Sequence, residues 1–462
     1  MIEIISRFAP SPTGNLHLGN VRTALFSFLY SLNQQGKFLL RIEDTDIARS
    51  NKIYTTQLLK DLQWLQIDWQ LGPFYQAQRL SIYEKYYQQL IDEKKAYFCF
   101  CNERELEISR KAQLRRGQAP KYSGKCRSLS LQECKIKKQQ GLKASLRFHV
   151  RYNSEIVFTD LLKAKQKFYG KEIGDFIIRR SNNMPSFMFC NAIDDSLMNV
   201  SVVMRGEDHL TNTPRQLAIL QACKLSAPKY AHLPLITGND ALPLSKRNGS
   251  RGIKDLKATG ITSLALLNYL SRLGHTYQNE NLLSKSELIA NFNLDNLHSS
   301  HARYDEQQLL YWQKKHLQNM TNAELFNWLQ QNLQQQINNF NLEIKQQQAL
   351  LQIIRENCYL QQQVKELLID LFSLNAQINP DSLSLLKETP AEFFAYVIAT
   401  LQEKFDFSYL KNQLQQKFQL KGKKIFLPLR LVLSNRQHGS NLDLILQALG
   451  KKLVIKKFNK LL

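Results

Sequence analysis

The first twenty residues join a short apolar run to a segment rich in proline and glycine, and this combination constrains the fold more than any other feature. Residues 2–5 are apolar enough for a buried strand, and Pro10 must end it because proline lacks the N–H that a sheet ladder needs. Beyond the turn, apolar residues recur at helical spacing over 21–33. His17 and Gly19 therefore lie near a helix N-terminus, where free backbone N–H groups favour an anion. The pattern predicts a strand, a turn and a helix that hold a phosphate group, and a nucleotide is the natural ligand.

A strand, a turn and a helix with a capping histidine also occur without any ligand, so this segment alone leaves both interpretations open. A second motif, Leu244-Ser245-Lys246-Arg247, follows an apolar run at 233–236 and a turn at 237–240. A lysine on such a loop can neutralise a phosphate group or a departing pyrophosphate. The pair of motifs therefore favours the nucleotide site over the purely structural interpretation.

The two motifs together resemble the two signature sequences of the class I aminoacyl-tRNA synthetases. Longer stretches closely resemble the bacterial type of glutamyl-tRNA synthetase, and they cover essentially the whole chain: 7–14, 205–209, 212–214, 422–424, 428–430 and 438–439. The resemblance implies an ATP-dependent ligase that forms glutamyl-adenylate and transfers glutamate to the terminal adenosine of tRNA, with Mg²⁺ assisting at the phosphates.

The order of the predicted elements indicates an α/β chain. Strands at 2–5 and 38–42 alternate with helices at 21–33, 54–65 and 80–93, which is typical of a doubly wound, Rossmann-like parallel sheet. Strands at 145–152 and 155–161 fall in an α+β insertion, and strands at 187–193, 200–204 and 233–236 with a helix at 213–225 resume the sheet. A helical C-terminal third follows.

Domain boundaries follow from these changes of pattern. We expect the two halves of the Rossmann-like catalytic domain at 1–96 and 184–240, separated by an insertion at 97–183 that, by the resemblance, binds the acceptor arm. The signature loop and a helical stem-contact region follow at 241–304, and a helical anticodon-binding domain at 305–462. The last domain is rich in glutamine, as at 330–336 and 346–348. Such a composition also fits disorder, but interleaved apolar residues at spacings of three and four favour packed helices with polar outer faces.

The charge balance favours a polyanionic partner. The 462 residues carry 62 Lys and Arg against 39 Asp and Glu, a formal net charge of +23. Basic runs that could follow a phosphate backbone occur at 110–111, 115–116, 135–138, 163–171 and 451–460. We expect tRNA(Glu), tRNA(Gln) or both as the partner, although each run alone is ordinary for a solvated surface. No apolar stretch is long enough to span a membrane and no targeting leader precedes the first strand, so we expect a cytoplasmic protein, usually monomeric in the family it resembles.

The resemblance assigns roles to individual residues. Those matched to ATP binding are Pro10, Ser11, Thr13, Gly14, His17, Gly19, Asn20, Leu244, Ser245, Lys246 and Arg247. Of these His17, Gly19 and Lys246 are expected to be catalytic, through phosphate contact, room for the adenine and neutralisation of pyrophosphate. Those matched to glutamate binding are Arg7, Ala9, Ser11, Glu43, Phe187, Asn191 and Arg205. Arginine suits a carboxylate through its bidentate geometry, so Arg7 is the candidate for the substrate side chain and Glu43 for its ammonium group. Structurally, Glu43 and Asp46 could instead cap a helix that begins near Ala48.

Two positions depart from the family pattern. The second motif usually begins with a lysine, where this chain has Pro243, so we expect weaker loop electrostatics and slower activation. A tyrosine is usual at Phe187, and the lost hydroxyl removes a hydrogen bond worth about 1–3 kcal/mol to a buried polar group. These changes leave open a second function class, a tRNA-binding paralogue that has lost activation.

Cysteines in the insertion suggest a metal site. Cys99 and Cys101 form a two-residue hook, and Tyr122 and Cys126 follow after a long gap. Zn²⁺ prefers tetrahedral thiolate and imidazole ligands, and some members of the family use a Tyr-x-x-x-Cys arrangement. Cys134 is a further candidate ligand, and reduced thiols without a metal are the alternative. We therefore expect Zn²⁺ as a structural ion at these four residues, in addition to ATP and Mg²⁺ at the active site.

Overall fold

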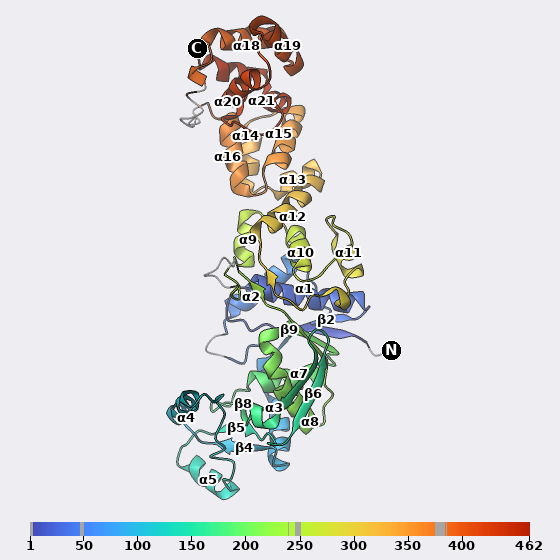
Figure 1. Cartoon of the computed structure of the whole chain (residues 1–462), viewed down its shortest axis with the longest axis vertical. Helices are drawn as coiled ribbons and strands as arrows, with labels where there is room; N and C mark the ends of the chain where they lie inside the picture. Colours follow the sequence, from blue (N-terminus) through green and yellow to red (C-terminus); the bar gives the residue numbers. More distant parts are fainter. Residues whose placement is uncertain (1–2, 47–49, 239, 245–250, 375–383, 385) are drawn as a thin grey trace. The chain divides into compact units, whose positions relative to one another are not determined.

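The computed structural model describes residues 3–462 apart from 47–49, 239, 245–250, 375–383 and 385 (Figure 1). The chain divides into two compact units. The first consists of Met1–Lys254 and Leu267–Asp305, and the second of Asp255–Leu266 and Glu306–Leu462. This division does not separate the finer domains expected within the first unit, and their boundaries stay predictions.

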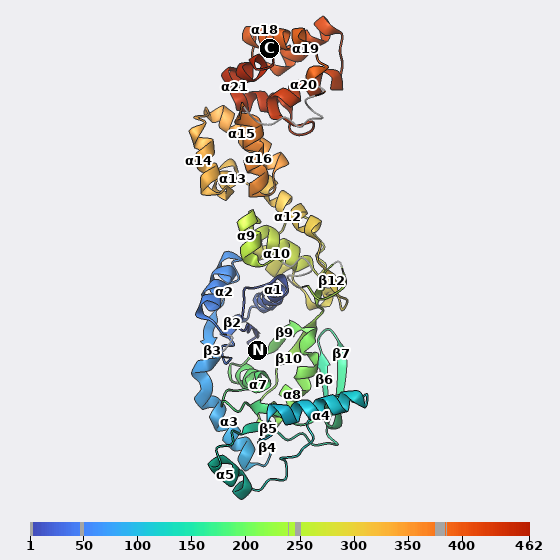
Figure 2. The ribbon, with the colours of Figure 1, turned by 90° about the vertical axis from the view of Figure 1, so that its left-hand side faces the viewer.

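A seven-stranded sheet forms the centre of the first unit. Its strands lie in the order β3 (Leu71–Tyr75), β2 (Lys37–Ile42), β1 (Ile5–Phe8), β9 (Val202–Gly206), β10 (Lys229–Leu233), β6 (Glu155–Asp160) and β7 (Ala164–Tyr169). All neighbours are parallel except β6 and β7, which form an antiparallel hairpin at one edge. Helix α1 (Leu18–Asn33) lies on one side of the sheet, and α7 (Phe187–Leu197) and α8 (Thr213–Cys223) lie on the other (Figures 1 and 2). The predicted Rossmann-like fold is confirmed.

The insertion contains its own three-stranded antiparallel sheet. It is built from β4 (Ala96–Cys99), β5 (Ser145–Phe148) and β8 (Phe176–Arg179), with α4 (Glu103–Arg115), α5 (Leu131–Gln139) and α6 (Gly170–Ile173). The hairpin β6–β7, expected to belong to the insertion, instead extends the central sheet, because β6 pairs with β10 at Tyr230 and Asp160. Alternation along a strand sets its faces but does not identify its neighbour, so the sequence pattern could not show this.

Three predicted strands differ from the structure. Residues 187–193, predicted as a strand, begin helix α7, since a short apolar run fits a buried helix as well as a strand. The strand predicted at 233–236 lies earlier, as β10, and is followed by the short β11 (Ile236–Thr237), which pairs with β12 (Ala302–Arg303). The first strand lies at Ile5–Phe8 and not at 2–5, which brings Arg7 into the sheet.

The remaining elements of the first part of the chain connect these layers. They are α2 (Lys52–Trp64), α3 (Leu80–Asp92), α9 (Ile253–Thr259), α10 (Ser263–Arg272) and α11 (Lys285–Ala290), with 3-10 helices at Gln76–Arg79, Glu207–Asn212 and Leu294–Asn296. The Asn51 side chain caps α2 by accepting a hydrogen bond from Ile53 N at 2.8 Å. Asp46 is therefore not the cap of this helix, and Ala48 lies outside the described residues. The helix start expected near Ala48, for which Asp46 is the better placed cap and Glu43 the poorer one, falls on residues outside those that the structure describes.

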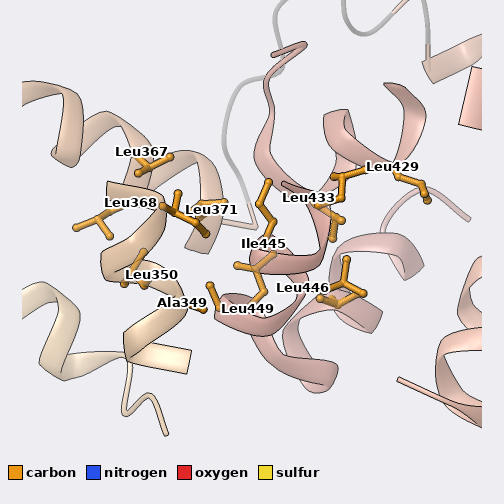
Figure 3. Packing of buried hydrophobic residues seen from close by; sticks show 14 of the residues in the cluster. Ala349, Leu350, Leu367, Leu368, Leu371, Leu429, Leu433, Ile445, Leu446 and Leu449 are labelled. Carbon is orange, nitrogen blue, oxygen red and sulfur yellow. The ribbon is translucent and has the colours of Figure 1, made fainter. Parts of the chain in front are cut away.

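The described residues of the second unit are helical. Besides most of α9 and the start of α10, its described helices include α12 (Glu306–Asn319), α13 (Asn322–Trp328), α14 (Gln331–Asn339), α15 (Ile344–Asn357), α16 (Gln361–Phe372), α18 (Ala391–Glu403), α19 (Phe407–Phe418), α20 (Lys423–Ser434) and α21 (Leu442–Asn459). Leucine and isoleucine side chains of α15, α16, α20 and α21 interdigitate in one core (Figure 3). On glutamine-rich α14, Leu333 and Ile337 are buried one helical turn apart. The glutamine-rich segments are packed helices, as predicted, and not disordered tracts.

Candidate active site

A pocket of about 510 Å³ opens at the carboxyl ends of β1 and β9. From β1 the sheet continues to β2 on one side and to β9 and β10 on the other, so the pocket lies where the strand order reverses. This is the place where doubly wound sheets bind ligands. The predicted residues that line it are Arg7, Ala9, Pro10, Ser11, Thr13, Gly14, His17, Gly19, Asn20, Glu43, Phe187 and Arg205. Asn191 and Leu244 are not among the lining residues, and Ser245, Lys246 and Arg247 lie outside the described residues.

His17 is the N-cap of α1 and faces the pocket. Its Nδ1 accepts a hydrogen bond from Asn20 N at 3.4 Å, which leaves the proton of the neutral ring on Nε2. Burial lowers the pKa of His17 below 6.5, although Asp208 raises it in part. At neutral pH the ring is therefore a neutral donor at the helix N-terminus.

Gly19 and Gly14 differ in what surrounds them. A Cβ at Gly19 would lie 3.1 Å from Cε1 and Nδ1 of His17, so any side chain there would press on the imidazole ring. A Cβ at Gly14 would meet no protein atom within 4 Å. Gly19 is thus required by the arrangement of the capping histidine, whereas Gly14 leaves space open toward the pocket.

Glu43 is a buried carboxylate in the pocket, just beyond the end of β2. It is fixed by Ser11, whose hydroxyl donates to Oε2 at 3.2 Å, and by a backbone bond from its N–H to Pro10 O at 3.0 Å. Burial raises the pKa of Glu43 above 4.5, while Arg41 and Arg7 oppose that rise. A ligand cation placed here would favour the ionised form.

Arg7 and Arg41 share one buried carboxylate. Arg7 Nε lies 3.3 Å from Asp195 Oδ1, and Arg41 Nη1 lies 2.8 Å from the same atom. Arg7 Nη1 also donates to Met204 O at 3.1 Å, and Arg7 lines the pocket. Burial raises the pKa of Asp195, but the two guanidinium groups lower it more, so the net pKa falls below 3.8.

Helix α7 supplies both this carboxylate and the far wall of the pocket. Phe187, Asn191 and Asp195 stand at helical spacing on one face. Asn191 accepts a hydrogen bond from Arg41 Nη2 and is 1% exposed, so it lies behind the pocket wall and not in it. The Phe187 ring stacks on His209 with centroids 5.2 Å apart, and burial lowers the pKa of His209 to about 4.

Arg205 is a buried cation at the end of β9. Burial lowers its pKa to about 10. Among the residues that the structure describes, no carboxylate forms an ion pair with it, and its Nη1 has no hydrogen-bond partner. An unmatched guanidinium in a pocket is suited to an anionic ligand.

The described ends of the second motif's loop lie beside this pocket. Leu244 N donates to Ile236 O at 2.8 Å, and Ile236 lines the pocket. On the far side of residues 245–250, Gly252 forms an antiparallel bridge with His17, and Ile253 N donates to Leu16 O at 3.3 Å. One anchor of the loop therefore lies at Ile236 and the other at the turn that precedes α1, and both Ile236 and His17 line the pocket.

Three thiols and a phenol meet in the insertion. Tyr122 Oη lies 3.3 Å from Cys99 Sγ and 3.5 Å from Cys101 Sγ, and Cys101 Sγ lies 3.7 Å from Cys126 Sγ. The three sulfur atoms fall within 4.8 Å of one another. Two thiolates bound to one tetrahedral Zn²⁺ at about 2.3 Å stand roughly 3.7 Å apart, so these four residues fit the ion. Cys134 is buried but does not belong to this group.

Two acids and one arginine behind the pocket were missed by the sequence analysis. Arg41 is fully buried in β2, and Asp194 accepts hydrogen bonds from Arg79 Nε at 2.8 Å and Tyr83 Oη at 2.6 Å. The available signals were an arginine within an apolar strand and the pair Asp194-Asp195 at the end of an apolar run. Charged residues in buried elements are almost always paired, so each predicted a partner but not which one.

Comparisons with known proteins agree with this geometry. The family model described as tRNA synthetases class I (E and Q), catalytic domain, matches residues 3–311, and the anticodon binding domain model matches residues 330–462. The chain therefore belongs to the family of class I tRNA synthetases for glutamate and glutamine, and the resemblance drawn from its motifs is confirmed.

Its relatives within that family share one activity in their names. Glutamate–tRNA ligase 2 of Coxiella burnetii (strain RSA 331 / Henzerling II) is 45% identical over 447 residues, covering 95% of each chain. Glutamate–tRNA ligase 2 of Nitrosococcus oceani is 43% identical, covering 96% of this chain and 95% of that protein. The crystal structure of a glutamate tRNA ligase from Elizabethkingia meningosepticum, in complex with its amino acid, superposes with a TM-score of 0.88 at 25% identity, covering 99% of both chains.

Proposed function

We propose that this chain makes glutamyl-tRNA, activating glutamate with ATP in the pocket at the carboxyl ends of β1 and β9 and then transferring it to tRNA. It is a ligase of the glutamate–tRNA type. The observation that carries the residue-level proposal is the pocket itself, which combines an anion-binding helix N-terminus, two arginines and a buried glutamate. One set of residues thus supplies binding groups for both ATP and glutamate, including the groups that recognise carboxylates.

ATP is proposed to bind with its phosphates at the N-terminus of α1. The Nε2–H of His17 is a donor at this end of the helix, and the backbone N–H of Gly19 adds a second one, whereas the Asn20 N–H is already bonded to His17 Nδ1. Pro10, Ser11, Thr13 and Gly14 complete the turn below. Mg²⁺, when bound, neutralises charge on the phosphates. The enzyme needs no covalent nucleophile, since activation requires stabilised charge on the transferred phosphorus.

Glutamate is proposed to bind between opposite charges in the same pocket. Arg7, held by Asp195 and Met204 O, and Arg205 supply guanidinium groups for its carboxylates, and Glu43 supplies a carboxylate for its ammonium group. Ala9 and Ser11 lie between them. Phe187 contributes a ring and no hydroxyl, so one polar contact usual in the family is missing.

Lys246 is proposed to neutralise pyrophosphate as it leaves. Support comes from the anchors of its loop, because Leu244 bonds to Ile236 and Gly252 bridges to His17, both of which line the pocket, and the lysine falls between these anchors in sequence. Pro243 replaces the other lysine of the motif, so Lys246 carries this role without a second ammonium group.

Zn²⁺ is proposed as a structural ion held by Cys99, Cys101, Tyr122 and Cys126. When bound, it would cross-link β4 to the segment that carries Tyr122 and Cys126, and no catalytic step passes through it. Arg147 stacks over the Tyr122 ring at 3.8 Å and fixes the phenol where the thiols meet.

The tRNA is proposed to contact basic residues of the insertion and of the second unit. Arg110 and Arg115 of α4 and its C-cap residue Arg116 are exposed. Not every predicted basic residue is available: Lys163 Nζ pairs with Glu207 at 2.6 Å, and buried Lys457 donates to two backbone carbonyls. Within the described part of the chain no helix is long and apolar enough to cross a membrane. We propose a monomer that works in the cytoplasm, with tRNA(Glu), tRNA(Gln) or both as its substrates.

Charging of purified glutamate and glutamine tRNAs, each with labelled glutamate, ATP and Mg²⁺, tests this function. We expect glutamate to be attached to at least one of them. Charging of glutamate tRNA alone marks a discriminating enzyme, and charging of glutamine tRNA marks a supplier for later amidation. The comparisons do not favour the activation-deficient paralogue, and tight tRNA binding with no charging of either tRNA would overturn the proposal in its favour.

A further inference from the structure

Arg205 is held along one edge of its guanidinium group only. Its Nε donates to His232 Nε2 at 3.2 Å, and its Nη2 donates to Thr213 Oγ1 at 2.7 Å. His232 and Arg205 are register partners on the adjacent parallel strands β10 and β9. Nη1 is buried and has no hydrogen-bond partner among the described residues, while Arg205 as a residue lines the pocket. The orientation of the free end is therefore set by the two groups that hold the opposite edge.

Those two groups depend on the protonation pattern of His232. Asp160 Oδ2 lies 2.6 Å from His232 Nδ1, and a carboxylate accepts but does not donate, so the proton of the neutral ring is on Nδ1. His232 Nε2 then carries a lone pair that accepts from Arg205. The Thr213 hydroxyl, 3.0 Å from the same Nε2, accepts from Arg205 and donates its own proton to the ring.

Asp160 is itself fixed by the backbone at the hairpin turn. Its Oδ1 accepts from Leu162 N and Lys163 N, both at 2.9 Å, and from His232 N at 3.3 Å. All of these donors are backbone N–H groups and cannot change direction. Asp160 and His232 are also fully buried, with 2% and 0% exposure. The carboxylate thus has one orientation, which fixes the imidazole proton in one place.

We propose that Asp160 and His232 are positioning residues that fix the guanidinium of Arg205 at the wall of the pocket, where it binds a carboxylate of the amino-acid substrate. The proposal rests on the proposed function, in which Arg205 binds glutamate. The hairpin β6–β7 contributes no residue to the pocket lining. Through Asp160, the last residue of β6, it nevertheless takes part in amino-acid binding under this proposal.

The substitution Asp160→Asn isolates the proton pattern with almost no change of shape. Two backbone N–H groups require the amide oxygen at the Oδ1 position, so the amide NH₂ must face His232 Nδ1. The neutral ring then carries its proton on Nε2 instead of Nδ1, so that two N–H groups, His232 Nε2–H and Arg205 Nε–H, face each other and no hydrogen bond forms between them. Loss of a charge-assisted hydrogen bond and its geometry predicts a rise of about 10- to 100-fold in KM for glutamate. We expect kcat at saturating glutamate and KM for ATP to change by less than about threefold, because neither Asp160 nor His232 lines the pocket.

Two matched comparisons separate positioning from general damage. Glu155→Gln changes an acid of the same hairpin whose partner is the exposed Lys167, and it should leave all constants at wild-type values. Thr213→Val removes the hydroxyl and should raise KM for glutamate, whereas Thr213→Ser keeps it and should raise KM less. If the thermal melting profile shows that Asp160→Asn is not folded, the comparison of Thr213→Val with Thr213→Ser tests the proposal instead.

Steady-state charging with glutamate, ATP and tRNA varied in turn gives each constant. A selective rise in KM for glutamate in Asp160→Asn, or in Thr213→Val relative to Thr213→Ser, supports the proposal. An unchanged KM for glutamate in folded Asp160→Asn, or equal values for the two Thr213 variants, overturns it while wild-type charging stands. Absence of charging by the wild-type protein instead overturns the proposed function.

Discussion

Replacing Asp195 with asparagine tests the buried charge network on which the pocket is built. The Asp195 side chain is 2% exposed and pairs with Arg41 at 2.8 Å and Arg7 at 3.3 Å. Removing one partner of a buried ion pair costs about 3–5 kcal/mol, because the remaining charge is left uncompensated. For a unit of about 290 residues, an unfolding entropy of roughly 2.1 cal/mol/K per residue turns that loss into a fall of about 5–8 °C in Tm.

The measurement is scanning calorimetry of the full chain, with the transition of the first unit identified as the one that ATP shifts upward. Asp68→Asn is the control, since Asp68 pairs with Lys285 at 3.1 Å on the surface with 63% of its side chain exposed. An exposed pair is worth about 0–1 kcal/mol, so the control should melt within about 2 °C of the wild type. If Asp195→Asn also melts within that range, the buried pairs do not stabilise this unit as argued.

The pH dependence of this effect has a definite sign. The net pKa of Asp195 lies below its usual 3.8, because Arg41 and Arg7 outweigh the upward effect of burial. A carboxylate with a lowered pKa in the folded state contributes stability that is complete above the unfolded value and is lost as the pH falls through the folded value. The difference in Tm between the wild type and Asp195→Asn should therefore be full at pH 7 and should narrow below pH 3.8.

Three further substitutions test separate parts of the assignment. Lys246→Ala should lower charging by about 100-fold or more with near-normal tRNA affinity, as expected for lost charge stabilisation, and unchanged charging would remove its catalytic role. Phe187→Tyr should lower KM for glutamate by about 2- to 10-fold if the restored hydroxyl bonds the substrate, and a higher KM would show that the contact with His209 matters more. Cys126→Ser should reduce bound zinc, measured by elemental analysis of protein purified without chelator, and wild-type protein holding less than about one third of an equivalent would contradict the site.

The turn between β1 and α1 could be predicted from sequence because the signals that form it are local. Pro10 ends a strand, His17 caps a helix and Gly19 leaves room for the histidine ring, and each of these effects acts within a few residues. The helical, glutamine-rich second unit was predictable for a similar reason, since apolar residues three and four apart define a buried face wherever they occur.

Helix α7 could not be predicted from local patterns. Residues 187–193 are apolar except for Asn191, so their period is hidden, and a strand and a helix fit equally well. The roles of Asp195 and Asp160 were also out of reach, because each depends on a partner more than 70 residues away in sequence: Arg7 for the first and His232 for the second. A single sequence does not show which of two residues far apart along the chain form such a pair.

The path of the chain between the two units has a consequence for how the protein is made. Residues Asp255–Leu266 belong to the second unit, yet the next segment, Leu267–Asp305, returns to the first. The Gly260 carbonyl accepts hydrogen bonds from Gln313 at 2.9 Å and Trp328 at 2.7 Å, residues that leave the ribosome some fifty to seventy positions later. No single proteolytic cut or truncation can therefore release either unit whole. During synthesis residues 255–266 are made before the last segment of the first unit, and the rest of the second unit follows only after that segment.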